Sequence, residues 1–362
     1  MAKNDDGRAC HSAGGFRRTV AAVRFSALGD IAMTLPVVYE ACRENPDTLF
    51  VMVTRAHPAR MFVNAPANLA VEGVDLDRYR GVAGMRRLVG MLREKYGVFT
   101  MVDLHDVIRT RLMRLFARLG GMTTSVIRKG RQEKKSLTRG RRKILVPLKP
   151  MHERYREAFQ KGGVAVEGDL RSLFADGRPD PSVFESATLP RQAGEKWIAI
   201  APFARHAGKI YPLPLMEKVV KALSGEGRKL FIFGFGEKEE AIIAQWRARC
   251  PGVVNMAAEA LGLEAELALL SYCDIMVSMD SANMHLASLA GIRVVSIWGA
   301  THPYCGFMGM RQRMGDAVQL DMTCRPCSVF GNRPCARGDL QCLNGIPPQL
   351  IIDKVENLLI HS

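Results

Sequence analysis

The chain has 362 residues, of which 48% are hydrophobic, so it is long enough for two ordinary domains and too apolar for a disordered protein. Its formal net charge of +15 indicates an anionic partner, such as a nucleic acid, a membrane surface or a phosphorylated substrate. Aromatic residues make up only 7%, which is little for base stacking, and no apolar run approaches the roughly 18 residues of a membrane-spanning helix.

The amino terminus and the cysteines bear on the compartment. Residues 1–17 are polar and are expected to form a mobile tail. This tail carries charges of both signs and no apolar stretch follows it, which argues against a signal peptide and for a cytoplasmic protein. Nine cysteines, an odd number, are poor evidence for a disulfide scaffold in such a protein.

The first predicted unit is a strand at residues 19–25, a tight loop at 26–29 and a helix from Asp30 to residue 42. The loop does not match G-x-G-x-x-G, so the dinucleotide-binding fingerprint is absent. On local grounds, Asp30 is explained equally well as a helix cap and as a chemical group.

Further strands are predicted at residues 49–53, 71–74 and 98–103, with a basic amphipathic helix at 84–96. The last strand ends at Asp103, and His105, Asp106 and Arg109 follow it. Ligands of α/β sheets gather at the carboxyl ends of strands, so these four residues are placed for ligand contact. Each of them, taken singly, also fits a capped helix with a solvated basic face.

Residues 128–143 form a basic run in which nine Lys and Arg residues are opposed by Glu133 alone. Such a run is usually solvated, mobile and attracted to polyanions. As a nucleic-acid arm it would lack aromatic partners. Residues 175–195, rich in Pro and Gly, are expected to form an interdomain linker.

The second half alternates strands and helices, with strands at residues 196–202, 229–234 and 253–256 and a helix at 263–271. The loop after the first of these strands contains Lys209, a point charge suited to a diphosphate, although an ordinary surface lysine explains it better outside any family context.

A compact βαβ unit follows, with strands at residues 274–278 and 294–298 and a helix at 282–290 that Gly291 ends. Asp280 and Ser281 are natural helix starters, because their oxygens can accept the amides of the first turn. Free amides at a helix start also bind phosphates, and small residues would admit a ligand. On spacing alone, an ordinary capped helix with one surface histidine explains this segment better.

Residues 280–287 read Asp-Ser-Ala-Asn-Met-His-Leu-Ala, and residues 294–303 read Val-Val-Ser-Ile-Trp-Gly-Ala-Thr-His-Pro. Together they resemble the heptosyltransferases of glycosyltransferase family nine, which carry D-[TS]-[GA]-x-[MS]-H-L-A and then a strand ending in G-x-T-x-P. The resemblance recurs at residues 20–43, 99–111, 196–217, 230–240 and 322–359, so it covers most of the chain.

The resemblance implies an α/β fold of the GT-B type, with two Rossmann-like domains facing across a cleft. Residues 18–180 would bind the acceptor, residues 190–345 the nucleotide sugar, and residues 346–362 would form a C-terminal helix. The implied activity is inverting transfer of heptose from ADP-heptose to the inner core of lipopolysaccharide. Two alternatives stay open: a GT-B transferase for another nucleotide sugar, and a non-catalytic basic protein that binds polyanions.

The resemblance also assigns roles to residues. The family motif R-x-S-x-x-G-D is matched by Arg24, Ser26, Gly29 and Asp30, and its aspartate is the proposed general base. A carboxylate at a helix start tends to stay ionised and can accept the proton of an attacking hydroxyl. The implied nucleotide-sugar contacts are Arg205, Lys209, Glu237, Glu240, Asp280, Ser281, Ala282 and His285. The implied acceptor contacts are Arg24, Ser26, Asp103, His105, Arg109, Arg128, Lys129 and Arg131.

The sequence departs from the family at two points: Tyr211 replaces the Trp of K-x-W-P, and the hydroxyl residues common near Ala204 and Arg205 are absent. Glu237 and Glu240 are equally suited to hold ribose hydroxyls. No obligatory cofactor or metal is expected, because lysine and helix amides can stabilise the departing ADP.

Four cysteines are spaced C-x2-C-x7-C-x6-C. Their thiolates can hold a structural zinc, but packed or free thiols are the favoured interpretation. These residues are Cys324, Cys327, Cys335 and Cys342.

The expected partners are a nucleotide sugar and an anionic lipopolysaccharide precursor at the cytoplasmic face of the inner membrane, with no nucleic acid.

Overall fold

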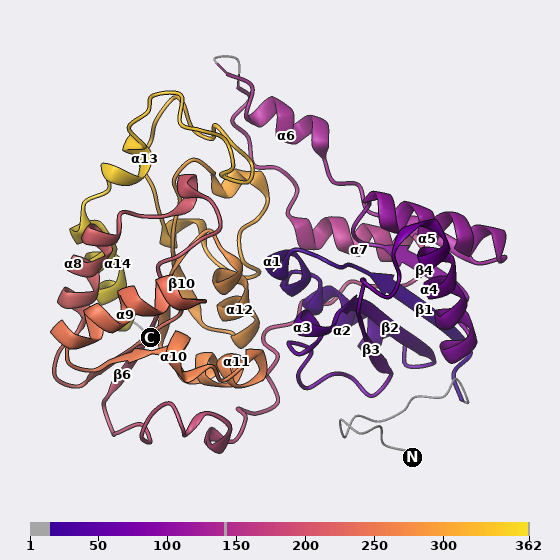
Figure 1. Ribbon diagram of the computed structural model, residues 1–362, viewed down its shortest axis with the longest axis horizontal. Helices are drawn as coiled ribbons and strands as arrows, with labels where there is room; N and C mark the ends of the chain where they lie inside the picture. The colour runs from indigo at the N-terminus through magenta and orange to yellow at the C-terminus, as the bar shows by residue number, and fades with distance from the viewer. Residues whose placement is uncertain (1–14, 141–142, 361–362) are drawn as a thin grey trace. The chain divides into compact units, whose positions relative to one another are not determined.

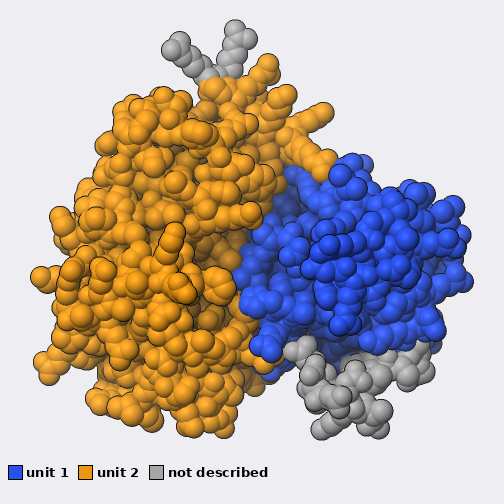
Figure 2. All heavy atoms as spheres, in the orientation of Figure 1, with its two compact units in different colours: residues 1–129, 151–170 blue, residues 130–150, 171–362 orange. Residues whose placement is uncertain are grey.

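The computed structural model describes residues 15–140 and 143–360, which fold into two compact units (Figure 2). Unit 1 is drawn from Met1–Lys129 and Met151–Leu170, and unit 2 from Gly130–Pro150 and Arg171–Ser362. Residues 130–150 thus interrupt unit 1 and fold with unit 2. Most of the expected mobile tail, residues 1–14, lies outside the described residues.

Unit 1 is built on a five-stranded parallel sheet with strand order β3-β2-β1-β4-β5 (Figure 1). Its strands are β1 (Arg18–Val23), β2 (Thr48–Arg55), β3 (Leu69–Val74), β4 (Thr100–Asp103) and β5 (Thr123–Val126). Its helices are α1 (Leu28–Ala32), α2 (Leu35–Glu44), α3 (Ala56–Ala59), α4 (Gly81–Tyr96), α5 (Ile108–Leu119) and α7 (Met151–Lys161).

The central strand of unit 1 explains where the first site forms. From Val20 to Val23, β1 is buried on both faces, as expected of a parallel strand covered by helices on each side. In the register of β1 and β4, Val23 lies beside Asp103. The residues that follow these two strands therefore emerge together at the carboxyl edge of the sheet.

Unit 2 contains a six-stranded sheet with order β11-β10-β9-β6-β7-β8, again parallel throughout. Its strands are β6 (Lys196–Ala201), β7 (Arg228–Ile232), β8 (Val253–Asn255), β9 (Ile275–Met279), β10 (Arg293–Ile297) and β11 (Ala317–Val318). Its α-helices are α6 (Arg131–Leu137), α8 (Leu213–Leu223), α9 (Glu237–Arg249), α10 (Met256–Glu259), α11 (Leu263–Tyr272), α12 (Ala282–Ala290), α13 (Gln341–Asn344) and α14 (Pro348–Ile360). Short 3-10 turns are η1 (Pro181–Phe184), η2 (Ala207–Lys209), η3 (Pro303–Cys305) and η4 (Met314–Asp316).

The βαβ prediction is confirmed: β9, α12 and β10 follow one another, and Gly291 ends the helix with a left-handed φ of 85°. The tail helix α14 packs against α8, and Arg228 at the start of β7 forms a 2.6 Å ion pair with Glu356. Within the segment expected as a linker, Phe184 packs edge-on against Tyr272, with 5.3 Å between ring centroids. That segment is therefore attached to unit 2.

One helix prediction is wrong. The helix expected from Asp30 to residue 42 consists of α1 and α2, which are separated at Met33 and Thr34. The Thr34 hydroxyl donates to the Ile31 carbonyl at 2.7 Å, and Pro36 occupies the first turn of α2, where its missing N–H costs nothing. Within residues 15–140 and 143–360, no helix is long and apolar enough to cross a membrane.

Candidate functional site

Arg24 and Asp30 stand on the two sides of the loop between β1 and α1. Nη2 of Arg24 lies 2.9 Å from Oδ2 of Asp30, and the side chains are 5% and 24% exposed. Arg24 also donates from Nη1 to the Leu104 carbonyl and lies over the Tyr155 ring, 5.5 Å from its centroid. The buried arginine is held from several sides, so its ion pair fixes the direction of the Asp30 carboxylate.

The two carboxylate oxygens of Asp30 have different surroundings. Oδ2 takes the ion pair and also faces the Ala27 amide at 3.4 Å. Among the residues that the structure describes, no hydrogen bond or ion pair ends at Oδ1. A carboxylate with one oxygen held and the other open is arranged to accept a proton from a ligand hydroxyl.

His105 lies beside this loop in its neutral form. Its Nδ1 accepts from the Phe25 amide at 3.4 Å, so its proton is on Nε2, which lies 3.4 Å from the Ser26 hydroxyl. Burial, followed by the positive charges of Arg24 and Lys129, lowers the pKa of His105 to about 4. Near neutral pH the imidazole is an uncharged hydrogen-bonding group at the edge of the site.

Asp103 supports the site from beneath. It is fully buried, and Oδ1 accepts from the amides of His105 and Asp106 at 2.8 Å each, while Arg114 Nε lies 3.1 Å from Oδ2. A side chain enclosed in this way shapes the turn, so we assign it to the support of the turn rather than to the expected acceptor contact. Arg109 is exposed on the first turn of α5, so it remains accessible.

In unit 2, Lys209 and Asp280 meet at the carboxyl ends of neighbouring strands. Lys209 follows β6 and Asp280 follows β9, and Nζ lies 2.8 Å from Oδ2. The lysine side chain is 16% exposed and the aspartate side chain 5%. An ammonium has three N–H donors, so one bond to Asp280 leaves donors for an anionic ligand.

Glycines allow the Lys209 side chain to lie against the backbone. At Gly331, which has a φ of +72°, a Cβ atom would come within 2.6 Å of Lys209 Cγ. At Gly208, a Cβ atom would meet the Gly331 carbonyl oxygen and the Ala300 Cβ, both at 2.9 Å. The aliphatic part of the Lys209 side chain therefore packs closely against backbone, and larger residues at these glycines would displace it.

The predicted capping of α12 by Asp280 and Ser281 is wrong. Ser281 is the N-cap residue, yet no side chain caps the helix, because the Asp280 carboxylate is directed to Lys209. The Ser281 hydroxyl instead lies 3.4 Å from that of Ser278. The first-turn amides of α12, beginning at Ala282, therefore have no side-chain cap and directly follow the strand end that carries Asp280. His285, one turn into the helix, is only 6% exposed.

The remaining residues predicted to contact the nucleotide sugar follow β6 and β7 at the same edge of this sheet. Arg205 is exposed between β6 and η2, and Glu237 and Glu240 are both exposed on the first turn of α9, which follows β7. The geometry does not favour either glutamate over the other as the ribose contact. Glu239, between them, has a different task, because its Oε2 accepts from the Phe235 amide at 2.7 Å.

Arg325 is a structural residue that the sequence predictions did not include, although they named the cysteines around it. The residue is 4% exposed and donates to the carbonyls of Gly299, Leu320, Trp298 and Thr301. Burial lowers its pKa. A single guanidinium thus fixes the loop after β10. The signal available in the sequence was an arginine within the motif Cys-Arg-Pro-Cys.

The basic run is more ordered than expected. It contains α6, which folds with unit 2, and Lys134 is 9% exposed with its Nζ 4.4 Å from the Phe307 ring centroid. Lys143 Nζ donates to the Cys324 carbonyl. Aromatic and carbonyl partners explain this order, because they compensate for desolvating the two ammonium groups. Arg128 and Arg131 remain exposed.

The four-cysteine cluster contains free thiols in different environments. Burial raises the pKa of Cys342 to about 11, while backbone hydrogen bonds, that of Leu340 first, lower the pKa of Cys335. Within the described ranges, no three His, Cys, Asp or Glu side chains are close enough together to hold a metal ion. The geometry therefore does not supply the four-thiolate zinc site that the spacing permits.

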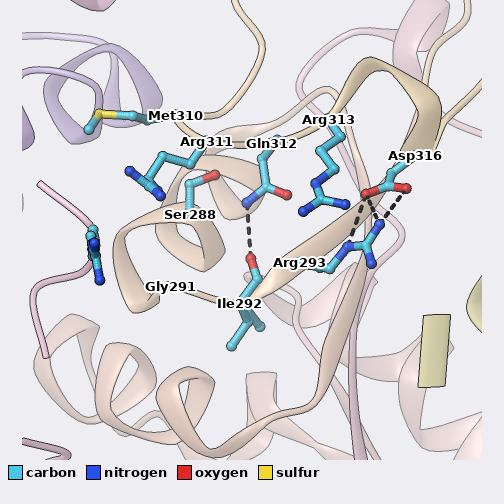
Figure 3. A pocket seen from close by; sticks show the side chains of 10 residues that line it. Ser288, Gly291, Ile292, Arg293, Met310, Arg311, Gln312, Arg313 and Asp316 are labelled. Atoms are coloured by element: carbon cyan, nitrogen blue, oxygen red, sulfur yellow. Dashed lines mark hydrogen bonds and ion pairs between the residues drawn. The ribbon is translucent and has the colours of Figure 1, made fainter. Parts of the chain in front are cut away.

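A separate hollow of about 190 Å³ lies near the amino end of β10 (Figure 3). Arg293 at the strand start forms a 2.8 Å ion pair with Asp316, and Gln312 donates to the Ile292 carbonyl at 2.9 Å. None of the predicted site residues lines this hollow. The hollow therefore lies at the opposite end of the strands from the residues predicted to contact the substrates.

A family model for glycosyltransferase family 9 (heptosyltransferase) matches residues 93–333. The chain belongs to this family. Among curated relatives, the lipooligosaccharide heptosyltransferase 2 of Campylobacter jejuni is 20% identical over 346 residues, which cover 92% of this chain and 96% of the relative.

Solved structures of family members have the same fold. The family 9 glycosyl transferase from Veillonella parvula aligns with a TM-score of 0.72 at 16% identity, covering 96% of this chain and 98% of that one. The E. coli ADP-heptose lps heptosyltransferase II aligns with a TM-score of 0.66 at 19% identity, covering 95% and 99%. The predicted GT-B fold of two parallel-sheet domains is therefore confirmed, and the family 9 chain is a glycosyltransferase.

Proposed function

We propose that this family 9 enzyme transfers heptose, with inversion, from ADP-heptose to the inner core of a lipopolysaccharide precursor. The observation that carries the proposal is the Asp30 carboxylate, which is oriented by buried Arg24 through one oxygen and open at the other. The names of the relatives support the substrates: one is a lipooligosaccharide heptosyltransferase, and an E. coli heptosyltransferase structure contains ADP.

In the proposed reaction, Asp30 takes the proton of an acceptor hydroxyl while that oxygen attacks the anomeric carbon of the donor. The bond from the anomeric carbon to the β-phosphate oxygen breaks, and ADP leaves with the bonding electrons. A single displacement of this kind inverts the anomeric centre. Ser26 and neutral His105 are the proposed hydrogen-bonding contacts of the acceptor, and Arg109 with Arg128, Lys129 and Arg131 its proposed charge partners.

The departing diphosphate needs positive charge at its developing oxyanion. We assign this task to Lys209 and to the uncapped first-turn amides of α12, beginning at Ala282. Arg205 is the second proposed phosphate contact, and Glu237 or Glu240 the proposed ribose contact. These groups carry the required charge, so we expect turnover to persist in EDTA.

We further propose that the enzyme works as a peripheral protein at the cytoplasmic face of the inner membrane, where the lipid acceptor is made. The net charge of +15 supports attraction to an anionic membrane surface.

The test is a transfer assay with ADP-heptose and a heptose-free inner-core precursor, read by mass spectrometry, together with calorimetric binding of ADP, UDP and GDP without metal. We expect a mass increase of one heptose and selective binding of ADP. Preference for UDP would retain the fold and overturn the heptose assignment. Binding to RNA with a steep salt dependence and to no nucleotide would favour the polyanion-binding alternative.

A further inference from the structure

Helix α5 presents apolar side chains on two opposite faces. Thr110, Met113 and Ala117 face inward and are buried. On the outward side, Ile108, Leu115 and Leu119 are exposed by 77%, 50% and 76%. Spacings of seven and four residues align them along one line of the helix, which we call the α5 stripe. Core packing does not explain the α5 stripe.

Arginines border the α5 stripe. Arg111 and Arg118 lie on one side of it and Arg109 on the other, at roughly 60–100° around the helix axis. All three are exposed, and α5 contains no acidic residue. Arg111 is also paired with Asp106 at 2.9 Å, so its guanidinium is held in place near the helix start.

We propose that the α5 stripe docks unit 1 on an anionic lipid membrane. Large apolar side chains rimmed by basic residues match the boundary between acyl chains and phosphate headgroups. Arginine suits this boundary, because its guanidinium binds phosphate oxygens in pairs while its stem covers apolar surface. The inference rests on the proposed function for which side of the membrane is bound. The docking surface itself is inferred from α5 alone.

A second copy of the chain is a poorer partner for the same face. A symmetric dimer would place the α5 stripe of one copy against that of the other, and would bring arginines opposite arginines. With no carboxylate on α5 to compensate, the like charges would repel. A surface of anionic headgroups lacks this conflict.

The position of α5 relates docking to the proposed acceptor site. Ile108 follows the turn that carries His105 and Asp106, and the helix leads away from the carboxyl edge of the sheet. Docking through the α5 stripe therefore brings the start of the helix, and with it the His105 turn, to the level of the headgroups. A lipid-borne acceptor would reach Asp30 from that surface.

The experiment compares the full-length protein with two triple variants in vesicle co-sedimentation. The vesicles contain phosphatidylethanolamine and phosphatidylglycerol at 3:1, or phosphatidylcholine alone, without donor or acceptor. The test variant is I108S/L115S/L119S. The control is V183S/L189S/I360S, whose residues are exposed by 50%, 78% and 73% in unit 2. The two variants thus lose similar apolar surface at different places.

We expect the test variant to partition at least about tenfold less onto the anionic vesicles, and the control to bind as the unaltered protein does. Binding of the unaltered protein should fall severalfold on phosphatidylcholine and in 0.5 M salt. Unchanged melting temperature and ADP affinity would show that the test variant is folded. Should it unfold, Ile108→Ser and Leu119→Ser singly, both at highly exposed positions, carry the same test with smaller decreases.

Equal partitioning of the test variant and the unaltered protein would overturn the inference, as would failure of the unaltered protein to bind anionic vesicles. A dimer in light scattering that I108S/L115S/L119S converts to a monomer would reassign the face to a second copy. Since no substrate is present, none of these outcomes bears on heptose transfer, which the transfer assay decides separately.

Discussion

The Arg24–Asp30 pair of unit 1 and the Lys209–Asp280 pair of unit 2 both lie at the carboxyl edge of their sheets, and the two pairs are built in opposite senses. In unit 1 the cation is the buried partner: the side chain of Arg24 is 5% exposed and that of Asp30 24%. In unit 2 the anion is buried: the side chain of Asp280 is 5% exposed and that of Lys209 16%. Unit 1 therefore presents an oriented negative charge to ligands, and unit 2 an oriented positive one.

Buried ion pairs contribute little to stability, because desolvation offsets most of their attraction. Both ion pairs are better explained by a role in orienting their more exposed partner. The supports differ accordingly: Arg24 makes further contacts with the Leu104 carbonyl and the Tyr155 ring, while Asp280 holds Lys209 through one short contact. A fixed base suits a proton transfer, and a lysine with donors to spare suits a diphosphate that must enter and leave.

The largest expected effect is on the base. Asp30→Ala should lower turnover on the order of 10²-fold or more, with little change in ADP affinity, because the proton acceptor is lost and the donor site is not. Turnover at saturating substrates and calorimetry of ADP measure the two quantities. Asp47→Ala, which removes an exposed aspartate that pairs with Arg17 at 3.5 Å, is the matched control. Full activity in Asp30→Ala would show that another group is the base.

Next in size is the effect on the donor cation. Lys209→Ala should weaken ADP binding roughly 10- to 100-fold, because a charge-assisted contact to phosphate is lost. Lys229→Ala is a close control, since Lys229 is 18% exposed and pairs with Glu195 at 3.8 Å in the same unit. Lys229 stands near the amino end of β7, away from the carboxyl edge of the sheet where Lys209 lies. If both variants bind ADP equally well, Lys209 does not contact the diphosphate.

Two histidines with a lowered pKa, buried His105 and half-buried His302, allow the units to be compared by pH. Burial lowers the pKa of His105 in unit 1 and of His302 in unit 2 to about 4 each, with Arg24 and Arg325 as the next causes. Between about pH 6.5 and pH 4 the unfolded chain binds more protons than the folded one, so stability is full above pH 6.5 and falls as the pH drops. Each histidine accounts for at most about 3 kcal/mol.

When the pH is lowered from 7 to 4.5, the variants His105→Gln and His302→Gln should each lose about 1–2 kcal/mol less folding stability than the unaltered protein. All three tryptophans belong to unit 2, so their fluorescence follows its unfolding in urea, while circular dichroism follows both units. The fluorescence transition should respond to His302→Gln, and His105→Gln should act on the remaining dichroism change. Exposed His57→Gln is the control. Identical pH slopes in all variants would contradict the assignment.

Local patterns predicted the frame of the molecule well, because strand and helix periodicity reports burial directly. The βαβ unit around α12 was placed correctly, with Gly291 as its stop. Roles that depend on a distant partner were not visible. Asp280 looked like a cap for the next helix, but Lys209, 71 positions earlier, directs its carboxylate.

The same limit explains two other differences. Arg325 donates hydrogen bonds to four carbonyls that only the folded loop brings together. The sequence motif around it therefore predicted a role only for the cysteines. The basic run looked mobile because its charges dominate the composition. Its order comes from Phe307 and the Cys324 carbonyl, which lie more than 170 positions further along the chain.

The smallest expected effect concerns the exposed charges that lie outside the two ion pairs. The variant R128S/K129S/R131S should raise the acceptor KM severalfold at low ionic strength, flatten its salt dependence and leave ADP affinity unchanged, because exposed charges act over about a Debye length and are screened by salt. R60S/R86S/R247S removes the same formal charge from exposed arginines elsewhere. An equal rise in KM for this control would mean that net charge, and not the position of the run, attracts the acceptor. An unchanged KM in the first variant would remove the acceptor role of the run and leave acceptor recognition to the turn of His105.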